Sequence, residues 1–170
     1  FQAKLRANIK YNHKNMSLKD LVIELNDDVN NAAKGEKFIT FFAGHYDGNT
    51  KVLQYINAGH NYPILLNESK TRFLNKGCIG LGMLEKIPKV EIEKIKLLKD
   101  TILVCYTDGL VELENNNNVA FETENLIKEV RKNFNLSMID LDHAIFKRLN
   151  EFKGDRDFLD DTAVMSCRFF

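Results

Sequence analysis

The chain has 170 residues, of which 44% are hydrophobic, including 12 Phe and 5 Tyr. This length and composition suit one folded domain with a substantial core and exclude a disordered chain. The 24 basic and 24 acidic side chains cancel to a net charge of zero, so the chain as a whole has no electrostatic drive toward nucleic acid or an anionic membrane.

The cysteines indicate a reducing compartment. Cys78, Cys105 and Cys167 are widely spaced and odd in number, which fits neither a disulfide framework nor a zinc motif. Two of them lie in apolar segments typical of strands. We therefore predict reduced core thiols in a cytoplasmic protein. The sequence also has no signal-peptide core and no run of about 18 apolar residues.

Helical periodicity dominates the first part of the chain. Apolar residues at four-residue steps predict a helix over residues 1–11. Ser17 begins a second predicted helix, with Asp20 as its capping-box acid, and the polar segment 30–35 ends it. The apolar stripe of the second helix consists of Leu18, Leu21, Val22, Leu25 and Val29.

Strand patterns follow, and two further helices interrupt them near the C-terminus. The predicted strands cover residues 38–46, 52–57, 62–66, 71–74, 90–97, 101–106 and 162–169. The turn at residues 47–49 (Asp-Gly-Asn) is typical of a hairpin. A bulge at residues 93–94 would account for a change of phase within the fifth strand. Thr123 and Ser137 begin the two helices.

Hairpins, rather than crossovers, connect most of these strands. This order favours an α+β fold in which helices flank antiparallel sheets. The run Asn115–Asn118 is predicted to be a solvated loop tip.

Two acidic segments stand at the ends of strands. Asp108 directly follows the apolar strand 101–106, and Gly109 lets a ligand or water approach the backbone closely. Four carboxylates precede the last strand, those of Asp155, Asp157, Asp160 and Asp161. Hard oxygen ligands suit magnesium, manganese or calcium rather than zinc. However, Asp-Gly is also a common turn and an acidic loop is usually just solvated, so residue types alone leave metal binding open.

Other catalytic motifs are missing from the sequence. It contains no H-x-E or H-E-x-x-H zinc motif, no G-x-S-x-G nucleophile elbow and no G-x-x-x-x-G-K-[ST] phosphate loop. Zinc chemistry, a serine or thiol nucleophile and P-loop nucleotide binding therefore have no support. We interpret His60, in the turn-like sequence Asn-Ala-Gly-His, as a structural residue.

Five segments occur in the order and spacing of one family. They are FITFFAGHYD, YINAGHNYP, CIGLGM, TILVCYTDGLVE and DDTAVM. Together they resemble the bacterial metal-dependent serine/threonine protein phosphatases, especially the branch of the stage II sporulation protein E and the sigma-B regulator phosphatase. The resemblance extends over residues 1–170. It implies a single phosphatase-like domain, a four-layer α-β-β-α sandwich of two antiparallel sheets flanked by helices.

The resemblance also implies a chemistry, the hydrolysis of a phosphoserine or phosphothreonine. The attacking water is activated by two Mn or Mg ions, roughly 3.5–4 Å apart. Asp108 and Asp160 correspond to metal ligands that converge in space, Asp161 is a less certain neighbour, and Gly109 is a backbone requirement. The signature residues expected to be structural are Asn57, Gly59 and His60.

Two departures from the family pattern stand out. Relatives carry a metal-bridging Asp and a Gly-His-Gly motif upstream of the segment that matches residues 1–10. The sequence begins after that motif, so we expect an N-terminally truncated domain with half a binuclear site and an uncovered sheet edge that favours self-association, for example as a homodimer. Glu122 stands where relatives usually have Gly, which we interpret as loop variation of little consequence.

The leading hypothesis is a phosphatase domain that acts on an anti-anti-sigma-like phosphoprotein. An upstream sensor or receiver domain would control it, and the domain itself would contact neither nucleic acid nor a membrane. The alternative is a non-catalytic, phosphatase-like interaction module. A third hypothesis treats the acidic cluster as a structural calcium or magnesium site.

Overall fold

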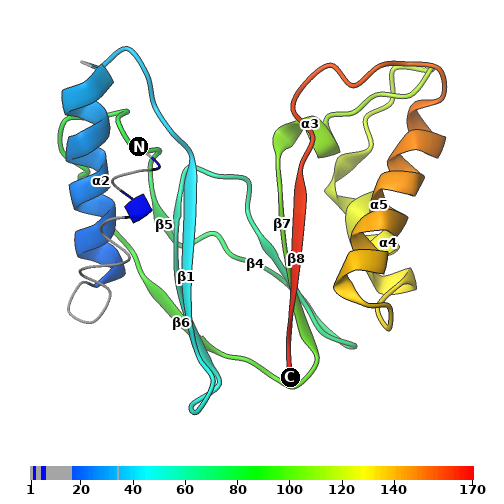
Figure 1. Cartoon of the computed structure of the whole chain (residues 1–170), viewed down its shortest axis with the longest axis horizontal. Helices are drawn as coiled ribbons and strands as arrows, with labels where there is room; N and C mark the ends of the chain where they lie inside the picture. The colour runs from blue at the N-terminus through cyan, green and yellow to red at the C-terminus, as the bar shows by residue number, and fades with distance from the viewer. Residues whose placement is uncertain (1, 3–4, 7–16, 34) are drawn as a thin grey trace. The chain divides into compact units, whose positions relative to one another are not determined.

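The computed structural model describes residues 2, 5–6, 17–33 and 35–170, which fall into two compact units (Figure 1). The first unit comprises Phe1–His60 and Leu74–Leu97, and the second comprises Asn61–Phe73 and Leu98–Phe170. Each unit contains one four-stranded sheet. None of the helices in the described part of the chain has the length and apolar character that a membrane span requires.

The sheet of the first unit is built around β2 (Val52–Ala58). β1 (Phe41–Asp47) pairs with β2 antiparallel through the predicted hairpin, and β6 (Glu93–Lys96) also pairs with it antiparallel. β5 (Gly77–Cys78) runs parallel to the end of β2. The expectation of purely antiparallel sheets is therefore wrong at this pair, because a long connection rather than a hairpin brings β5 beside β2.

One helix, α2 (Leu18–Ala33), packs on this sheet. Ser17 caps it, because the Ser17 hydroxyl accepts a hydrogen bond from the Asp20 N–H at 3.1 Å and donates one to the Asp20 carboxylate at 2.7 Å. The predicted capping box is confirmed, although the helix continues to Ala33, inside the segment predicted as a turn. The buried residues shared by helix and strands are Val22, Leu25, Val29, Ile56, Ala58 and Leu81.

The sheet of the second unit is entirely antiparallel. Its strands, in spatial order, are β4 (Thr71–Phe73), β3 (Ile64–Leu66), β7 (Thr101–Tyr106) and β8 (Val164–Phe169). Two helices, α4 (Glu122–Lys132) and α5 (Met138–Lys153), pack on the sheet (Figure 1). The buried core between them includes Ile64, Ile102, Val104, Leu126, Val130, Leu141, Ile145 and Leu149.

Local signals explain where these helices begin. The Ser137 hydroxyl accepts a hydrogen bond from the Asp140 N–H at 3.1 Å, which confirms the second predicted N-cap. A further helix, α3 (Asp108–Val111), was not predicted. It contains only 4 residues, too few for a hydrophobic period to show in the sequence.

The predicted class, α+β with two sheets and flanking helices, is confirmed. Two details differ. β6 pairs continuously with β2 from Glu93 to Lys96, so the predicted bulge is wrong, and the strand simply begins after the alternating residues 90–92. The helix predicted over residues 1–11 lies mostly outside the described residues, of which 2, 5 and 6 are helical.

The cysteines are less buried than predicted. Cys78 and Cys105 are half-buried and Cys167 is exposed, so the prediction of core thiols is wrong. Burial, and secondarily the neighbouring Cys167, raises the pKa of the Cys105 thiol to about 11. Cys105 therefore remains a neutral thiol at physiological pH.

Candidate metal centre

The two predicted acidic segments meet at one end of neighbouring strands. β7 ends at Tyr106, directly before Thr107 and Asp108, and β8 begins at Val164, directly after the Asp160 segment. The antiparallel register pairs Tyr106 with Val164. The turn after β7 and the turn before β8 therefore lie side by side in the second unit.

Hydrogen bonds join the two turns. The Thr107 hydroxyl donates to the Asp161 carbonyl at 2.8 Å and accepts from the Ala163 N–H at 2.9 Å. The Thr162 hydroxyl donates to the Gly109 carbonyl at 3.2 Å. Each turn thus holds the backbone of the other.

Gly109 allows this close approach. A Cβ at this position would lie 2.8 Å from the Asp161 carbonyl oxygen and 3.2 Å from the Asp160 Cβ. Both distances are shorter than an ordinary van der Waals contact, so any side chain would push the two turns apart. The structure therefore gives a physical reason for the glycine after Asp108.

The carboxylates of Asp108, Asp160 and Asp161 are all exposed. Asp108 accepts a hydrogen bond from the Gly109 N–H at 3.1 Å, and Asp160 accepts one from the Asp161 N–H at 2.7 Å. An ionised carboxylate can accept about four hydrogen bonds or ligand contacts. Asp108 and Asp160 therefore keep acceptor capacity toward solvent, where a cation could bind. Asp161 contributes its backbone carbonyl to the contact with Thr107.

The four acids before β8 do not gather into one cluster. Within the described residues, no group of three or more His, Cys, Asp or Glu side chains is close enough to hold a metal ion. Only the Asp160–Asp161 end of the segment packs against the turn of Asp108. Two neighbouring carboxylates nevertheless fit Mg²⁺ or Mn²⁺, because such ions often take one or two carboxylates and complete their shell with water and substrate phosphate.

A cleft of about 380 Å³ adjoins this pair of turns. Its walls include Gly109, Asp160 and Leu159, together with an ion pair between Arg156 and Glu114 at 2.8 Å. Sequence reasoning missed Arg156 and Glu114, since 42 positions separate the two residues and no local pattern indicates their pairing.

A wider groove in the same unit, of about 780 Å³, begins at the end of β7. Tyr62, Phe73 and Tyr106 contribute aromatic rings to it, and Glu112 and Glu124 contribute carboxylates. Burial is the main cause that raises the pKa of the Tyr106 phenol above its usual value. A hydrogen bond between the Tyr106 and Thr123 hydroxyls opposes this rise in pKa, and the neighbouring Glu124 adds to it. The Tyr106 hydroxyl is therefore neutral at physiological pH.

The signature residues of the first unit form a closed turn. Asn57 is buried, its side-chain oxygen accepts from the His60 N–H at 2.8 Å, and its amide group donates to the His60 carbonyl at 2.9 Å and to the Leu74 carbonyl at 3.4 Å. Gly59 has φ of +66°, a conformation that favours glycine. These contacts use the backbone of residue 60 rather than its imidazole.

The two-sheet α+β fold is shared with solved PP2C-type phosphatase domains. More narrowly, the chain belongs to the stage II sporulation protein E (SpoIIE) family, whose model matches residues 5–170.

Solved structures of this class share the fold at low sequence identity. The RsbU and RsbW domains of a Mycobacterium tuberculosis protein are 23% identical, with a TM-score of 0.74, over 96% of this chain and 44% of that chain. The Mn-presoaked phosphatase domain of SpoIIE from Bacillus subtilis is 13% identical, with a TM-score of 0.60, over 98% of this chain and 71% of that chain. RsbX in complex with magnesium is also 13% identical, with a TM-score of 0.68 and the same coverage, 98% and 71%.

A sequence relative is much longer than this chain. Protein IcfG of Synechocystis sp. is 28% identical over 133 residues, which are 77% of this chain and 21% of IcfG. The chain therefore spans about a fifth of the length of that relative.

Proposed function

We propose that this chain is the phosphatase domain of a metal-dependent protein serine/threonine phosphatase. The observation that carries the proposal is the pairing of two acidic turns, in which the Thr107 hydroxyl contacts the Asp161 carbonyl at 2.8 Å and so brings Asp108 and Asp160 to one place. Membership of the SpoIIE family supports the same activity.

Asp108 and Asp160 would hold Mn²⁺ or Mg²⁺, with Asp161 as a neighbouring acid. When bound, such an ion acts as a Lewis acid toward phosphate oxygens and lowers the pKa of water. The protein's own contribution is position: Gly109 lets the two turns touch, and the Thr107 and Thr162 hydroxyls fix them. The adjoining cleft has room for substrate groups next to the phosphate.

The natural substrate would be a phosphorylated, anti-anti-sigma-like regulator, with an upstream sensor or receiver domain as the control element. The RsbU, RsbW, RsbX and SpoIIE relatives support this placement in sigma-factor signalling. A cytoplasmic location follows from the same assignment, and the three free cysteines suit a reducing compartment.

The test is Mn²⁺-dependent hydrolysis of a phosphoserine peptide by the full-length protein that contains this chain. Asp108→Asn should lower kcat/KM by at least about 100-fold, since loss of metal charge at the phosphate costs several kcal/mol of transition-state stabilisation. The matched control is Asp155→Asn, because Asp155 is an exposed acid of the same loop that the proposal does not use. Full activity in Asp108→Asn would refute the assignment of the site.

The same assay separates the other two hypotheses. A non-catalytic module would bind the phosphoprotein but show no Mn²⁺-dependent hydrolysis in the parent protein. A purely structural cation site would predict that Mn²⁺ still raises the melting temperature of Asp108→Asn.

A further inference from the structure

We infer that Arg156 is a positioning residue. Its side chain binds the hairpin after α3, in which Glu114 pairs with Ala120. In this way it joins the loop between α5 and β8 to the hairpin and holds Asp160 beside Asp108. The inference rests on the proposed function, because it gives Arg156 a role in presenting a metal ligand. The cleft of about 380 Å³ is lined by Arg156, Glu114 and Asp160, among others. The Arg156–Glu114 ion pair and the Asp160 carboxylate therefore belong to one small region.

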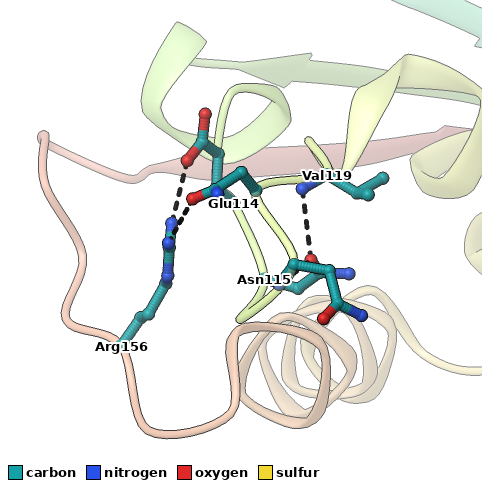
Figure 2. A network of polar contacts seen from close by, with 6 residues as sticks. Glu114, Asn115, Val119 and Arg156 are labelled. Atoms are coloured by element: carbon teal, nitrogen blue, oxygen red, sulfur yellow. Dashed lines mark hydrogen bonds and ion pairs between the residues drawn. The ribbon is translucent and has the colours of Figure 1, made fainter.

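The Arg156 guanidinium bridges two residues of the hairpin. One nitrogen, Nη1, donates to Glu114 Oε2 at 2.8 Å (Figure 2). The other, Nη2, donates to Asn118 Oδ1. A single exposed ion pair contributes little to stability. A planar guanidinium that satisfies two separate acceptors, however, fixes the direction of the side chain as well as its distance.

The hairpin that binds Arg156 is held in place by its own hydrogen bonds and by a buried side chain. Glu114 and Ala120 form a β-bridge, and the Asn115 side chain accepts hydrogen bonds from backbone N–H groups of the turn, including that of Val119 at 3.2 Å (Figure 2). Phe121, directly after the hairpin, is fully buried. The predicted loop tip is confirmed, since residues 116–118 are exposed and form a turn. In addition, the Asn115 side chain organises this turn and the Asn118 side chain binds Arg156.

The loop between Arg156 and Asp160 has few contacts of its own. Within the described structure, the Asp157 side chain forms no hydrogen bond or ion pair, and Leu159 is 87% exposed. After Asp160, the bonds to Thr107 fasten the backbone. Asp160 therefore lies between two points at which the loop is held. The Arg156 side chain holds the loop before Asp160, and the contacts with Thr107 hold it after Asp160.

Lys153 does not replace the contacts of the Arg156 side chain. Its Nζ donates to the Arg156 carbonyl at 2.5 Å and lies 5.6 Å from the centroid of the Phe158 ring. These contacts hold the loop to the end of its own helix, α5, and do not join it to the hairpin. Gly154 lies close to the Asn116 side chain, but the Arg156 guanidinium supplies the polar contacts with the hairpin.

The test compares Arg156→Ala with the parent in the full-length protein, with Mn²⁺ alone as the probe. We expect the Mn²⁺ affinity to fall about 10-fold, the lower end of the loss seen when a group bonded directly to a metal ligand is removed, because Arg156 acts on Asp160 through the loop. In metal-free protein, the amides of residues 155–163 should exchange hydrogen faster by mass spectrometry. Arg156→Lys keeps the charge but cannot span both acceptors, so its affinity should lie between those of Arg156→Ala and the parent.

The matched control is Arg131→Ala. Arg131 also fastens a hairpin of the second unit, since its Nη2 donates to Thr71 Oγ1 at 2.7 Å, but it contacts no part of the Asp160 loop. This variant should lose stability while its Mn²⁺ affinity and the exchange of residues 155–163 stay unchanged. An equal loss of affinity in both alanine variants would overturn the inference.

Two further outcomes are decisive. Exchange over residues 155–163 that is unchanged in Arg156→Ala would overturn the inference, with or without metal binding. A parent protein that binds no Mn²⁺ would refute the proposed function instead, and the exchange measurement would then still decide whether Arg156 holds the loop.

Discussion

The turn after β2 and the turn after β7 both carry family signatures, yet they use their polar groups in opposite ways. Asn57 is 3% exposed, and both ends of its amide are bonded within the turn or to Leu74. Asp108 is exposed, and its described contact is with the N–H of the next residue, Gly109. One turn is closed on itself, while the other presents charge to solvent.

This difference separates a structural signature from a chemical one. A buried neutral amide whose groups are all bonded stabilises a fold and has no capacity left for a ligand. An exposed carboxylate on a fixed backbone keeps its acceptor capacity and contributes little to stability by itself. Mutations in the first turn should therefore change stability, and mutations in the second should change metal binding.

Of the changes in these two turns, Gly59→Ala should have the larger effect on stability. The positive φ of Gly59 costs about 1–2 kcal/mol for an alanine. In addition, the new Cβ would lie 2.7 Å from the Gly80 backbone nitrogen, and such overpacking typically costs about 1–3 kcal/mol. The free energy of unfolding of the chain in urea should therefore fall by about 3 kcal/mol.

Gly48→Ala is the control for this change, because no atom lies within 4 Å of a Cβ built at Gly48. It should alter the free energy of unfolding by less than about 0.5 kcal/mol. If Gly59→Ala lowered the free energy of unfolding by as little as Gly48→Ala, the turn after β2 would not be the closed turn described above.

Gly109→Ala tests the second of the two turns, the one after β7. The alanine Cβ would separate the turn of Asp108 from that of Asp160, which should lower Mn²⁺ affinity about 10-fold and the free energy of unfolding by about 1–2 kcal/mol. Calorimetric titration with Mn²⁺ below the melting temperature measures the first effect. Gly59→Ala, once folded, should bind Mn²⁺ like the parent. A larger loss of Mn²⁺ affinity in Gly59→Ala than in Gly109→Ala would contradict the assignment of a structural role to the first turn and a metal-binding role to the second.

The sequence was most informative where structure depends on neighbours along the chain. Ser17 and Ser137, each with an acid three positions later, marked the starts of α2 and α5, and the apolar run 101–106 marked β7. The failures are long-range. Nothing near Gly77 indicates that it pairs parallel to β2, and nothing near Arg156 indicates that it reaches the hairpin after α3.

The candidate site shows the same limit. The sequence identifies Asp108 as an acid that follows an apolar strand and Asp160 as an acid that precedes one. The antiparallel register of β7 and β8 explains why the turns that carry these two acids meet. The sequence could not show that the acids of the loop fail to form a group of three or more, because that depends on the path of the loop between α5 and β8.

The smallest predicted effect concerns Glu122, at a position where the family resemblance implies glycine. Glu122 has φ of +63° at the first position of α4, so its replacement is not the neutral loop variation that the sequence suggested. Glu122→Gly should raise the free energy of unfolding by about 1 kcal/mol, because glycine adopts this conformation without strain. Glu124→Gly removes the same charge from the same helical turn but has no strain to relieve, so it should lower that free energy by about 1 kcal/mol. Opposite signs in urea unfolding would show that backbone conformation, rather than the charge of the side chain, determines which residue is most stable at position 122.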